Sequence, residues 1–192
     1  HEQTHDEEPI INHVVIKADV RGSTDITHQM IKRGLNPASY FSLNFFNPIS
    51  ELLNDYGADK VFIEGDAIIL SIYERENAPG GWYGVARACG IAVNILLIIS
   101  RYNEKNKKNK LPVLELGFGI NFKGSPPTFL FDGEHRIMIS SAINLADRQS
   151  GCSMVIRKAL KNKATPFNLY VFHSETEALV GKTSDDLLLR YN

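Results

Sequence analysis

The chain has 192 residues, which suits one domain, and its apolar share of 43% is enough to bury a single sizeable core. A formal net charge of −1 excludes a global field that would draw the chain to nucleic acid or to an anionic membrane. Two cysteines, Cys89 and Cys152, do not make a disulfide framework, so we expect small buried thiols in a reducing, cytoplasmic compartment.

Neither the N-terminus nor the most apolar stretch has the pattern of a targeting or membrane segment. The polar N-terminal residues lack the apolar middle of a signal peptide, so we assign residues 1–11 to a linker and residues 12–192 to one domain. Ile91–Ser100 is apolar but contains Asn94 and is too short to span a bilayer. We therefore expect no membrane contact by this domain.

The N-terminal third begins with a strand pattern and continues with helical patterns. His13–Val20 is rich in β-branched residues, which predicts a mostly buried strand. The turn Arg21–Thr24 follows, and one of its two hydroxyl residues should cap a helix that ends near Lys32. Apolar residues at helical spacing predict a second helical stretch over residues 38–56, which Pro48 should kink or break.

The middle of the chain predicts a hairpin and a long helix. Asp59–Ile63 and Asp66–Tyr73 read as strands joined by the two-residue turn Glu64-Gly65. A helix is expected from Trp82 to Tyr102. Residues 103–110, rich in lysine and asparagine, should form a solvated loop, and the lack of interleaved aromatic residues argues against a nucleic-acid patch.

The last third predicts further strands around one helix. Leu111–Phe122 and Phe129–Ile139 are strand candidates, and Ser140–Gln149 reads as a helix with Ser140 and Ser141 as capping candidates. Three more strands are expected at residues 154–159, 167–173 and 186–191. Because one hairpin is embedded among alternating strands and helices, we predict an α+β fold with helices packed on a mixed sheet.

Two acidic segments suggest a site for a metal ion beside phosphates. Asp19 ends a buried strand and precedes a glycine-containing turn, whose amides and helix start can face anionic oxygens. Glu64-Gly65-Asp66 lies in the hairpin. Taken singly, each segment is more typical of an ordinary turn or cap. Together, aspartates on adjacent strands can share a pair of magnesium ions.

A third segment carries an amide and a fixed cation on one helix face. Asn144 and Arg148 stand at positions i and i+4 of the predicted helix, and a guanidinium matches a phosphate group in shape. The alternative interpretation of these two residues is an ordinary solvent-facing helix surface, on which Arg148 makes an ion pair.

The three segments and their order resemble the class III adenylate and guanylate cyclase catalytic domain, from about Val14 to the C-terminus. Ile-Asn-Leu-Ala-Asp-Arg, residues 143–148, is similar to the Val-Asn-x-Ala-x-Arg motif of that family. The hairpin is similar to its Lys-Phe-Ile-Gly-Asp segment. The resemblance implies a ferredoxin-like or palm-like sheet flanked by helices.

The resemblance implies a lyase that converts a nucleoside triphosphate into a 3′,5′-cyclic monophosphate and pyrophosphate. ATP is the substrate that the family leads us to expect. Two Mg²⁺ or Mn²⁺ ions would be bound by Asp19, Asp66 and the carbonyl of Val20. Asn144 would orient the ribose, and Arg148 would stabilise charge on the α-phosphate. The triphosphate would lie against Arg21, Gly22, Ser23, Thr24 and Lys182.

The resemblance also implies a head-to-tail homodimer. Each site would take its aspartates from one chain and Asn144 and Arg148 from the other, so a lone monomer should be inactive.

The expected base-reading positions depart from the family. Phe62 stands where adenylate cyclases have a lysine, and Ile137 where they have aspartate or threonine. Lys60 lies two residues before Phe62 on the same expected strand face, but about 6–7 Å away. We weigh a cyclase with unusual base choice, including GTP or pyrimidines, an adenylate cyclase using other residues, and an inactive dimerising or nucleotide-sensing homologue.

An active cyclase is favoured, because an inactive one has no chemical need for both aspartates with the asparagine and arginine. A palm-type polymerase or diguanylate cyclase is a more distant alternative, since the hairpin lacks a Gly-Gly-Asp/Glu-Glu-Phe run. The scattered histidines do not indicate a metal site.

Overall fold

The computed structural model of the chain describes residues 8–77, 83–151, 171–172 and 179–181. The chain divides into two compact units, His1–Cys152 and Ser153–Asn192. In the second unit, β7 (Val171–Phe172) pairs antiparallel with β8 (Leu179–Gly181), and β7 falls inside the strand predicted at residues 167–173. The strands predicted at residues 154–159 and 186–191, and Lys182 and Cys152, lie outside the described residues.

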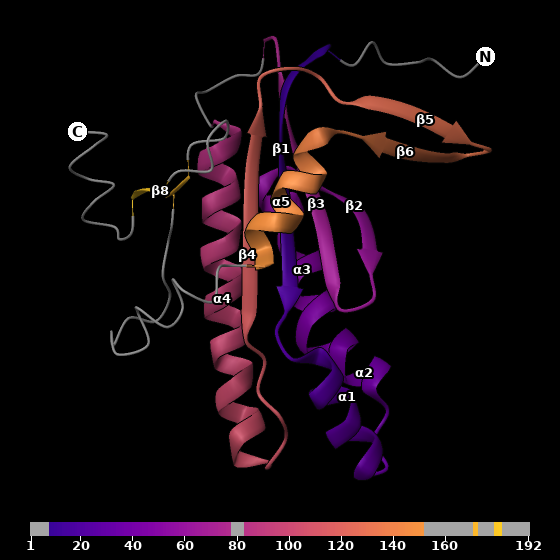
Figure 1. Ribbon diagram of the computed structural model, residues 1–192, viewed down its shortest axis with the longest axis vertical. Coiled ribbons are helices and arrows are strands. Elements are labelled where there is room, and N and C mark those ends of the chain that lie inside the picture. The colour runs from indigo at the N-terminus through magenta and orange to yellow at the C-terminus, as the bar shows by residue number, and fades with distance from the viewer. Residues whose placement is uncertain (1–7, 78–82, 152–170, 173–178, 182–192) are drawn as a thin grey trace. The chain divides into compact units, whose positions relative to one another are not determined.

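The first unit is built on a four-stranded sheet with the order β2-β3-β1-β4 (Figure 1). Its strands are β1 (Ile10–Val20), β2 (Ala58–Glu64), β3 (Ala67–Arg75) and β4 (Leu116–Lys123). This order, with helices between β1 and β2 and between β3 and β4, confirms the ferredoxin-like α+β prediction. All three pairings are antiparallel, where we predicted a mixed sheet. β1 begins at Ile10, inside the segment that we assigned to the linker.

Helices fill the connections. They are α1 (Ser23–Lys32), α2 (Pro37–Phe41), the π-helix η1 (Ser42–Phe46), α3 (Asn47–Leu52), the 3₁₀ helix η2 (Asn54–Tyr56), α4 (Gly84–Lys108) and α5 (Ser141–Gly151). The predicted stretch 38–56 is interrupted as expected, because a π turn lies just before α3, whose second residue is Pro48. Gly57, with a φ of 56°, ends the series in the left-handed conformation.

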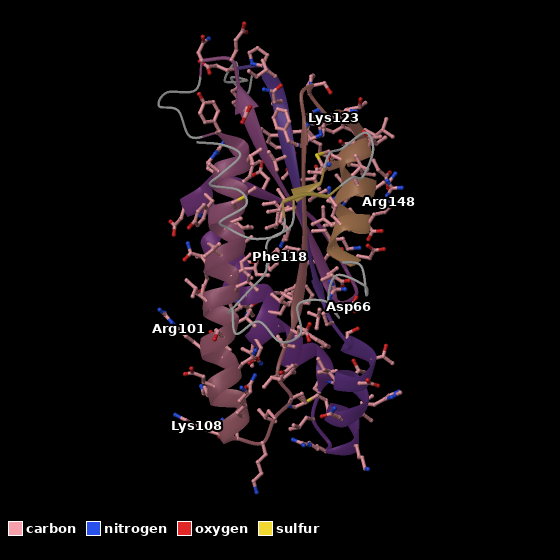
Figure 2. The ribbon with its side chains drawn as sticks, turned by 60° about the vertical axis from the view of Figure 1, so that its left-hand side comes forward. Asp66, Arg101, Lys108, Phe118, Lys123 and Arg148 are labelled. Atoms are coloured by element: carbon pink, nitrogen blue, oxygen red, sulfur yellow. The ribbon has the colours of Figure 1, made fainter. Side chains whose placement is uncertain are left out.

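Helix α4 is longer than the sequence pattern predicts, and the solvated loop expected over residues 103–110 is wrong. The Asn103 side chain bonds both the N–H and the C=O of Leu114, at 2.8 and 2.7 Å. Asn106 is buried and donates to Asn44 at 3.1 Å. Because these two amides have tertiary partners, the helix continues to Lys108. The side chains of Lys108 and of Arg101, about two turns earlier, are exposed (Figure 2).

By length and composition alone, α4 is the one described helix that passes a test for crossing a membrane. Its Ile91, Ile95 and Ile99 are buried against the sheet, at the helical spacing of a core-facing stripe. In this structure α4 is therefore a core helix of the layer beside the sheet. Cys89, on the same helix, is a half-buried free thiol whose pKa is raised by burial.

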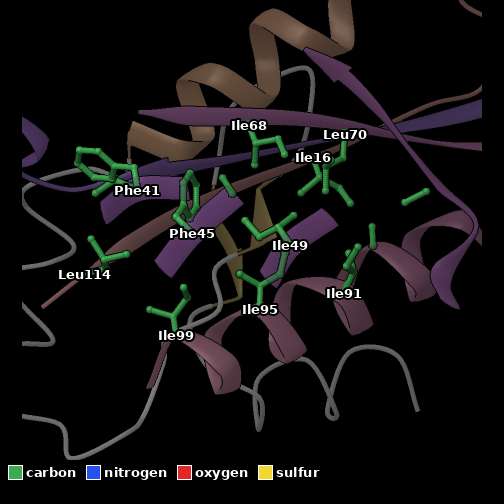
Figure 3. Close-up of a cluster of buried hydrophobic side chains, with 14 of the residues drawn as sticks. Ile16, Phe41, Phe45, Ile49, Ile68, Leu70, Ile91, Ile95, Ile99 and Leu114 are labelled. Carbon is green, nitrogen blue, oxygen red and sulfur yellow. The ribbon is translucent and has the colours of Figure 1, made fainter. Parts of the chain in front are cut away.

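The main core lies between one face of the sheet and helices α1 to α4. It takes the even-numbered residues of β1 and β3, because side chains alternate across a strand. Its large side chains include Ile16, Phe41, Phe45, Ile49, Ile68, Leu70, Ile91, Ile95, Ile99 and Leu114 (Figure 3).

A smaller core lies on the opposite face, between the odd-numbered residues of β1 and β3 and helix α5. Val15 and Ile69 pack there with Ala142, Ala146 and Met138. Met138 belongs to a second hairpin, β5 (Thr128–Asp132) and β6 (His135–Ile139), which extends away from the sheet (Figure 1). The single strand predicted over residues 129–139 is wrong, because the chain reverses at Gly133, whose φ is 60°.

Candidate functional site

The two aspartates meet where β1 ends. Asp19 lies on the sheet face covered by α5 and pairs laterally with Ala67. Asp66 is the second residue of the turn between β2 and β3, not the first residue of a strand as predicted, because Gly65, with a φ of 58°, takes the first turn position. The N–H of Val20 donates to the Asp66 carbonyl at 3.0 Å, which fixes the turn against the end of β1.

The aspartate pair has the electrostatics of a cation site. Burial raises the pKa of Asp19, and the negative charge of Asp66 raises it further, whereas Lys17 and Arg21 oppose this shift. A cation between the two carboxylates would relieve their repulsion. The described residues contain no group of three or more histidine, cysteine or acidic side chains that could hold a metal. Two carboxylates are compatible with magnesium, which needs only one or two of them when phosphates and water supply the remaining ligands.

The turn after Asp19 presents a helix start to the aspartate pair. Gly22 has a φ of 62° and precedes α1, whose first turn receives no side-chain cap from the residues that the structure describes. The prediction that Ser23 or Thr24 caps α1 is therefore wrong. Ser23 instead donates its hydroxyl hydrogen to the Asp66 carboxylate. The amide N–H groups at the start of α1 can donate hydrogen bonds to an anion, as helix N-termini do to phosphates.

The Arg21 side chain turns away from this helix start. Its guanidinium donates to the carbonyls of Ser150 and Gly151, the latter at 2.8 Å, at the C-terminal end of α5. A cation there satisfies carbonyls that the helix leaves without partners. Arg21 thus joins α5 to the strand that carries Asp19.

A groove of about 380 Å³ adjoins Asp66 and the start of α1. Thr27, His28 and Phe41 line it together with Ser23 and Thr24. None of these three residues was predicted as part of the site. Their sequence did contain a signal for a shared surface, since Thr24, Thr27 and His28 lie on one face of α1 at helical spacing. Only the packing of α2 shows that this face lines a groove.

Asn144 and Arg148 point away from their own sheet. The buried stripe of α5 is Ala142, Ala146 and Ser150, and a helix turns roughly 200° over two residues, so Asn144 and Arg148 lie on the opposite, exposed side. Figure 2 shows Arg148 on the outer side of α5, not directed toward Asp66. The structure therefore places both residues on one face, as predicted, but does not bring them to the aspartate pair of the same chain.

Helix α5 lies unusually close to β4. A Cβ atom on Gly119 would overlap the Ala146 carbonyl oxygen, and one on Gly117 would overlap Arg21 and the Ser150 carbonyl oxygen. These two glycines let the α5 backbone rest on the strand.

The expected base-reading residues are exposed apolar side chains on different elements. Phe62, on β2, is 43% exposed, and Ile137, on the projecting β5–β6 hairpin, is 47% exposed. Strand alternation predicted that Lys60 shares the sheet face of Phe62, and this prediction is wrong. The ladder shifts at Val61, so that Lys60 pairs with Leu70 and Phe62 with Ile69, on opposite faces.

An ionic cluster that was not predicted from the sequence joins β1, β2 and α5. Lys17 bonds Asp147 of α5 and, at 3.4 Å, Glu64 of β2. Burial acts to lower the pKa of Lys17, but the two carboxylates outweigh it and raise the pKa, so Lys17 is a cation. A lysine in a buried strand was the available signal, because a buried ammonium requires a partner.

Comparison with known proteins places this arrangement in a fold family. No protein-family model and no curated protein matches the sequence. Solved structures do match: a guanylyl cyclase with a TM-score of 0.59 and 18% identity, covering 92% of this chain and 95% of its own. The adenylyl cyclase CyaB from P. aeruginosa gives a TM-score of 0.63 at 17% identity, covering 91% and 90%. The chain has the class III nucleotide cyclase fold.

The guanylate cyclase domain of RhGC from Catenaria anguillulae, solved in complex with GTP, also shares this cyclase fold, with a TM-score of 0.59, 15% identity, and coverage of 88% and 93%. Identities this low establish the fold. The chemistry of this chain has to be argued from its own residues.

Proposed function

We propose that this chain is a nucleotide cyclase, which converts a nucleoside triphosphate to the 3′,5′-cyclic monophosphate and pyrophosphate for signalling in the cytoplasm. One observation carries the proposal: Asp19 and Asp66 meet beside the uncapped start of α1. This arrangement would provide a cation site and a phosphate site side by side, on a fold shared with adenylyl and guanylyl cyclases.

The chain's own groups would position the reaction. The aspartate pair, with the Val20 carbonyl, would hold two Mg²⁺ or Mn²⁺ ions, which supply charge neutralisation and an activated hydroxyl when bound. The amides of residues 22–24 would face the triphosphate. Asn144 would orient the ribose, and Arg148 would stabilise charge that builds on the α-phosphate. In-line attack by the ribose 3′-hydroxyl then needs no protein nucleophile.

The active form would be a homodimer. Asn144 and Arg148 face away from the sheet that bears their own aspartates, so a second copy must supply them to each site. The exposed Ile137 fits the same arrangement, since the β5–β6 hairpin that carries it is not part of the four-stranded sheet. In this dimer each site combines residues of both chains.

The apolar side chains of Phe62 and Ile137 at the expected base-reading positions favour a second candidate, an inactive cyclase homologue that dimerises or senses nucleotides. The two are separated by incubating concentrated protein with each of the four nucleoside triphosphates and Mn²⁺ or Mg²⁺. We expect a cyclic product. If none forms at concentrations where dimers exist, the cyclase proposal is overturned.

Asp66→Ala should abolish product formation and Mn²⁺-dependent nucleotide binding, with an unchanged circular dichroism spectrum. Asp55→Ala, an exposed aspartate in η2, is the matched control and should keep full activity. Activity in Asp66→Ala would refute the metal assignment.

Mixing inactive Asp66→Ala and Arg148→Ala chains tests the composite site. Random pairing puts one intact site in each mixed dimer and should restore about a quarter of the wild-type activity. No recovery in a mixture shown to exchange subunits would refute the shared site.

A further inference from the structure

One member of the ionic cluster of Lys17, Glu64 and Asp147 lies in the same row of the sheet as Phe62. Lys17 of β1 pairs with Ile69 of β3, and Ile69 pairs with Phe62 of β2. Directly paired residues share a sheet face, so these side chains stand on the face that also bears Asp19. The next row toward the aspartates holds Asp19, Ala67 and Glu64. The cluster therefore spans the row of the expected base position, through Lys17, and the row of Asp19, through Glu64.

The cluster combines exposed acceptors with a buried donor. The Lys17 side chain is only 10% exposed, whereas those of Glu64 and Asp147 are 64% and 57% exposed. The Lys17 ammonium has three N–H donors, and its two contacts use two of them. Glu64 touches Lys17 at 3.4 Å through Oε2. A buried cation thus stands beside a carboxylate that remains largely open to solvent.

We propose that Glu64 and Lys17 read the base of the substrate and select guanine, with Phe62 stacking on the ring. This inference rests on the proposed cyclase function and names its substrate class. Glu64 accepts hydrogen bonds from guanine N1–H and the N2 amino group, and Lys17 donates to O6. The pair replaces the polar reading that Phe62 and Ile137 cannot supply.

The balance of donors and acceptors favours guanine over adenine. The cluster has two carboxylates for one ammonium, so it is richer in acceptors than in donors. The Watson–Crick edge of guanine presents two donor groups beside one acceptor, while that of adenine presents one donor group and one acceptor. The two adjacent guanine donors also match the two oxygens of one carboxylate, which is the strong geometry for a charged acceptor.

A purely mechanical role is the competing interpretation. Through Asp147, Lys17 also ties α5 to the sheet, so its removal can loosen Asn144 and Arg148 for every substrate. The two roles differ in what they change. An anchor scales the turnover of all triphosphates by the same factor, whereas a base reader changes the ratio between them.

The test measures kcat/KM of the dimer for GTP, ATP and ITP with Mn²⁺. Inosine keeps O6 and N1–H but lacks the N2 amino group. We expect GTP to exceed ATP, and ITP to fall about tenfold or more below GTP, because a hydrogen bond to a charged group is lost. Glu64→Gln and Lys17→Met should each lower the GTP-to-ATP ratio by about tenfold or more.

Two matched controls carry the same chemical changes at exposed sites. Glu51→Gln on α3 and Lys107→Met on α4 should leave the GTP-to-ATP ratio unchanged. Thermal melting of all four variants establishes that they are folded. A wild type that prefers ATP, an ITP rate equal to that of GTP, or a uniform loss for all three nucleotides in Lys17→Met overturns the base assignment while leaving the cyclase proposal intact.

A wild type with no turnover of any triphosphate overturns the cyclase proposal instead. The base assignment is then measured separately, as the calorimetric affinity for GTP and ATP with Mn²⁺. Equal affinities overturn it, and a GTP preference that Glu64→Gln removes supports it.

Discussion

Replacing Gly119 by alanine should push α5 off the sheet. Gly119 lies on β4 beneath the helix, and an added Cβ would overlap the Ala146 carbonyl oxygen. It would also lie 2.7 Å from both the Ala146 carbonyl carbon and the Ser150 nitrogen. All three are backbone atoms, so no side-chain rotation can relieve the contact.

The size of the effect follows from the displacement. Ordinary contact begins near 3.4 Å, so the two 2.7 Å contacts alone require the helix backbone to withdraw by roughly 0.7 Å, and the closer Ala146 carbonyl oxygen requires more. Overpacking of this kind costs about 1–3 kcal/mol, and a rigid backbone neighbour places Gly119→Ala near 3 kcal/mol. For a domain of this size, that lowers the melting temperature by roughly 6–12 °C.

The assay is thermal and urea unfolding followed by circular dichroism, with Gly151→Ala as the control. Gly151 ends α5, and a Cβ there meets nothing within 4 Å, so this variant should melt within a degree or two of the wild type. Because α5 carries Asn144 and Arg148, Gly119→Ala should also lower cyclic product formation. Equal melting temperatures for Gly119→Ala and Gly151→Ala would refute the close packing of α5 on β4.

Two further outcomes test the fold around the site. Burial lowers the pKa of His13, which bonds the Ser125 carbonyl and the Ser140 hydroxyl at 2.6 Å each. The unfolded chain then binds this proton more readily, so the stability due to neutral His13 is full above the ordinary pKa of 6.5 and is lost as pH falls. The melting difference between wild type and His13→Gln should therefore shrink from about pH 7.5 to about pH 5, and a constant difference would contradict this. Asn106→Ala should cost about 1–3 kcal/mol in urea unfolding, because the buried amide bonds Asn44, whereas exposed Asn109→Ala should be neutral.

Local patterns were sufficient wherever the signal lies in adjacent residues. The β-branched run of β1 predicted a buried strand, and the helical spacing over residues 38–56 predicted the helical stretch that Gly57 ends. The spacing of Asn144 and Arg148 predicted a shared helix face, because helical periodicity does not depend on the rest of the fold. The order of these elements, with one embedded hairpin, predicted an α+β fold with helices packed on a sheet, and the resemblance to the cyclase domain implied its ferredoxin-like form.

Local patterns failed where a distant partner decides the structure. Residues 103–108 have the composition of a loop, yet they are helical because Asn103 and Asn106 bond Leu114 and Asn44. The face of Lys60 was wrong because one extra residue, Val61, enters the ladder with β3. A bulge reverses the alternation of every residue beyond it, and strand periodicity alone does not reveal it.

The sequence by itself determined the fold class. It also predicted four candidate site residues, Asp19, Asp66, Asn144 and Arg148, because each lies in a short motif with its own local geometry. The tertiary structure decided how they group. Asp66 reaches Asp19 through a turn held by the Val20 N–H, while Asn144 and Arg148 face away from both. The tertiary structure also brought Glu64 and Asp147 to Lys17, although they lie 47 and 130 residues after it along the chain. Such contacts follow from the pairing of β1 with β3 and the packing of α5 on β4, which no local pattern encodes.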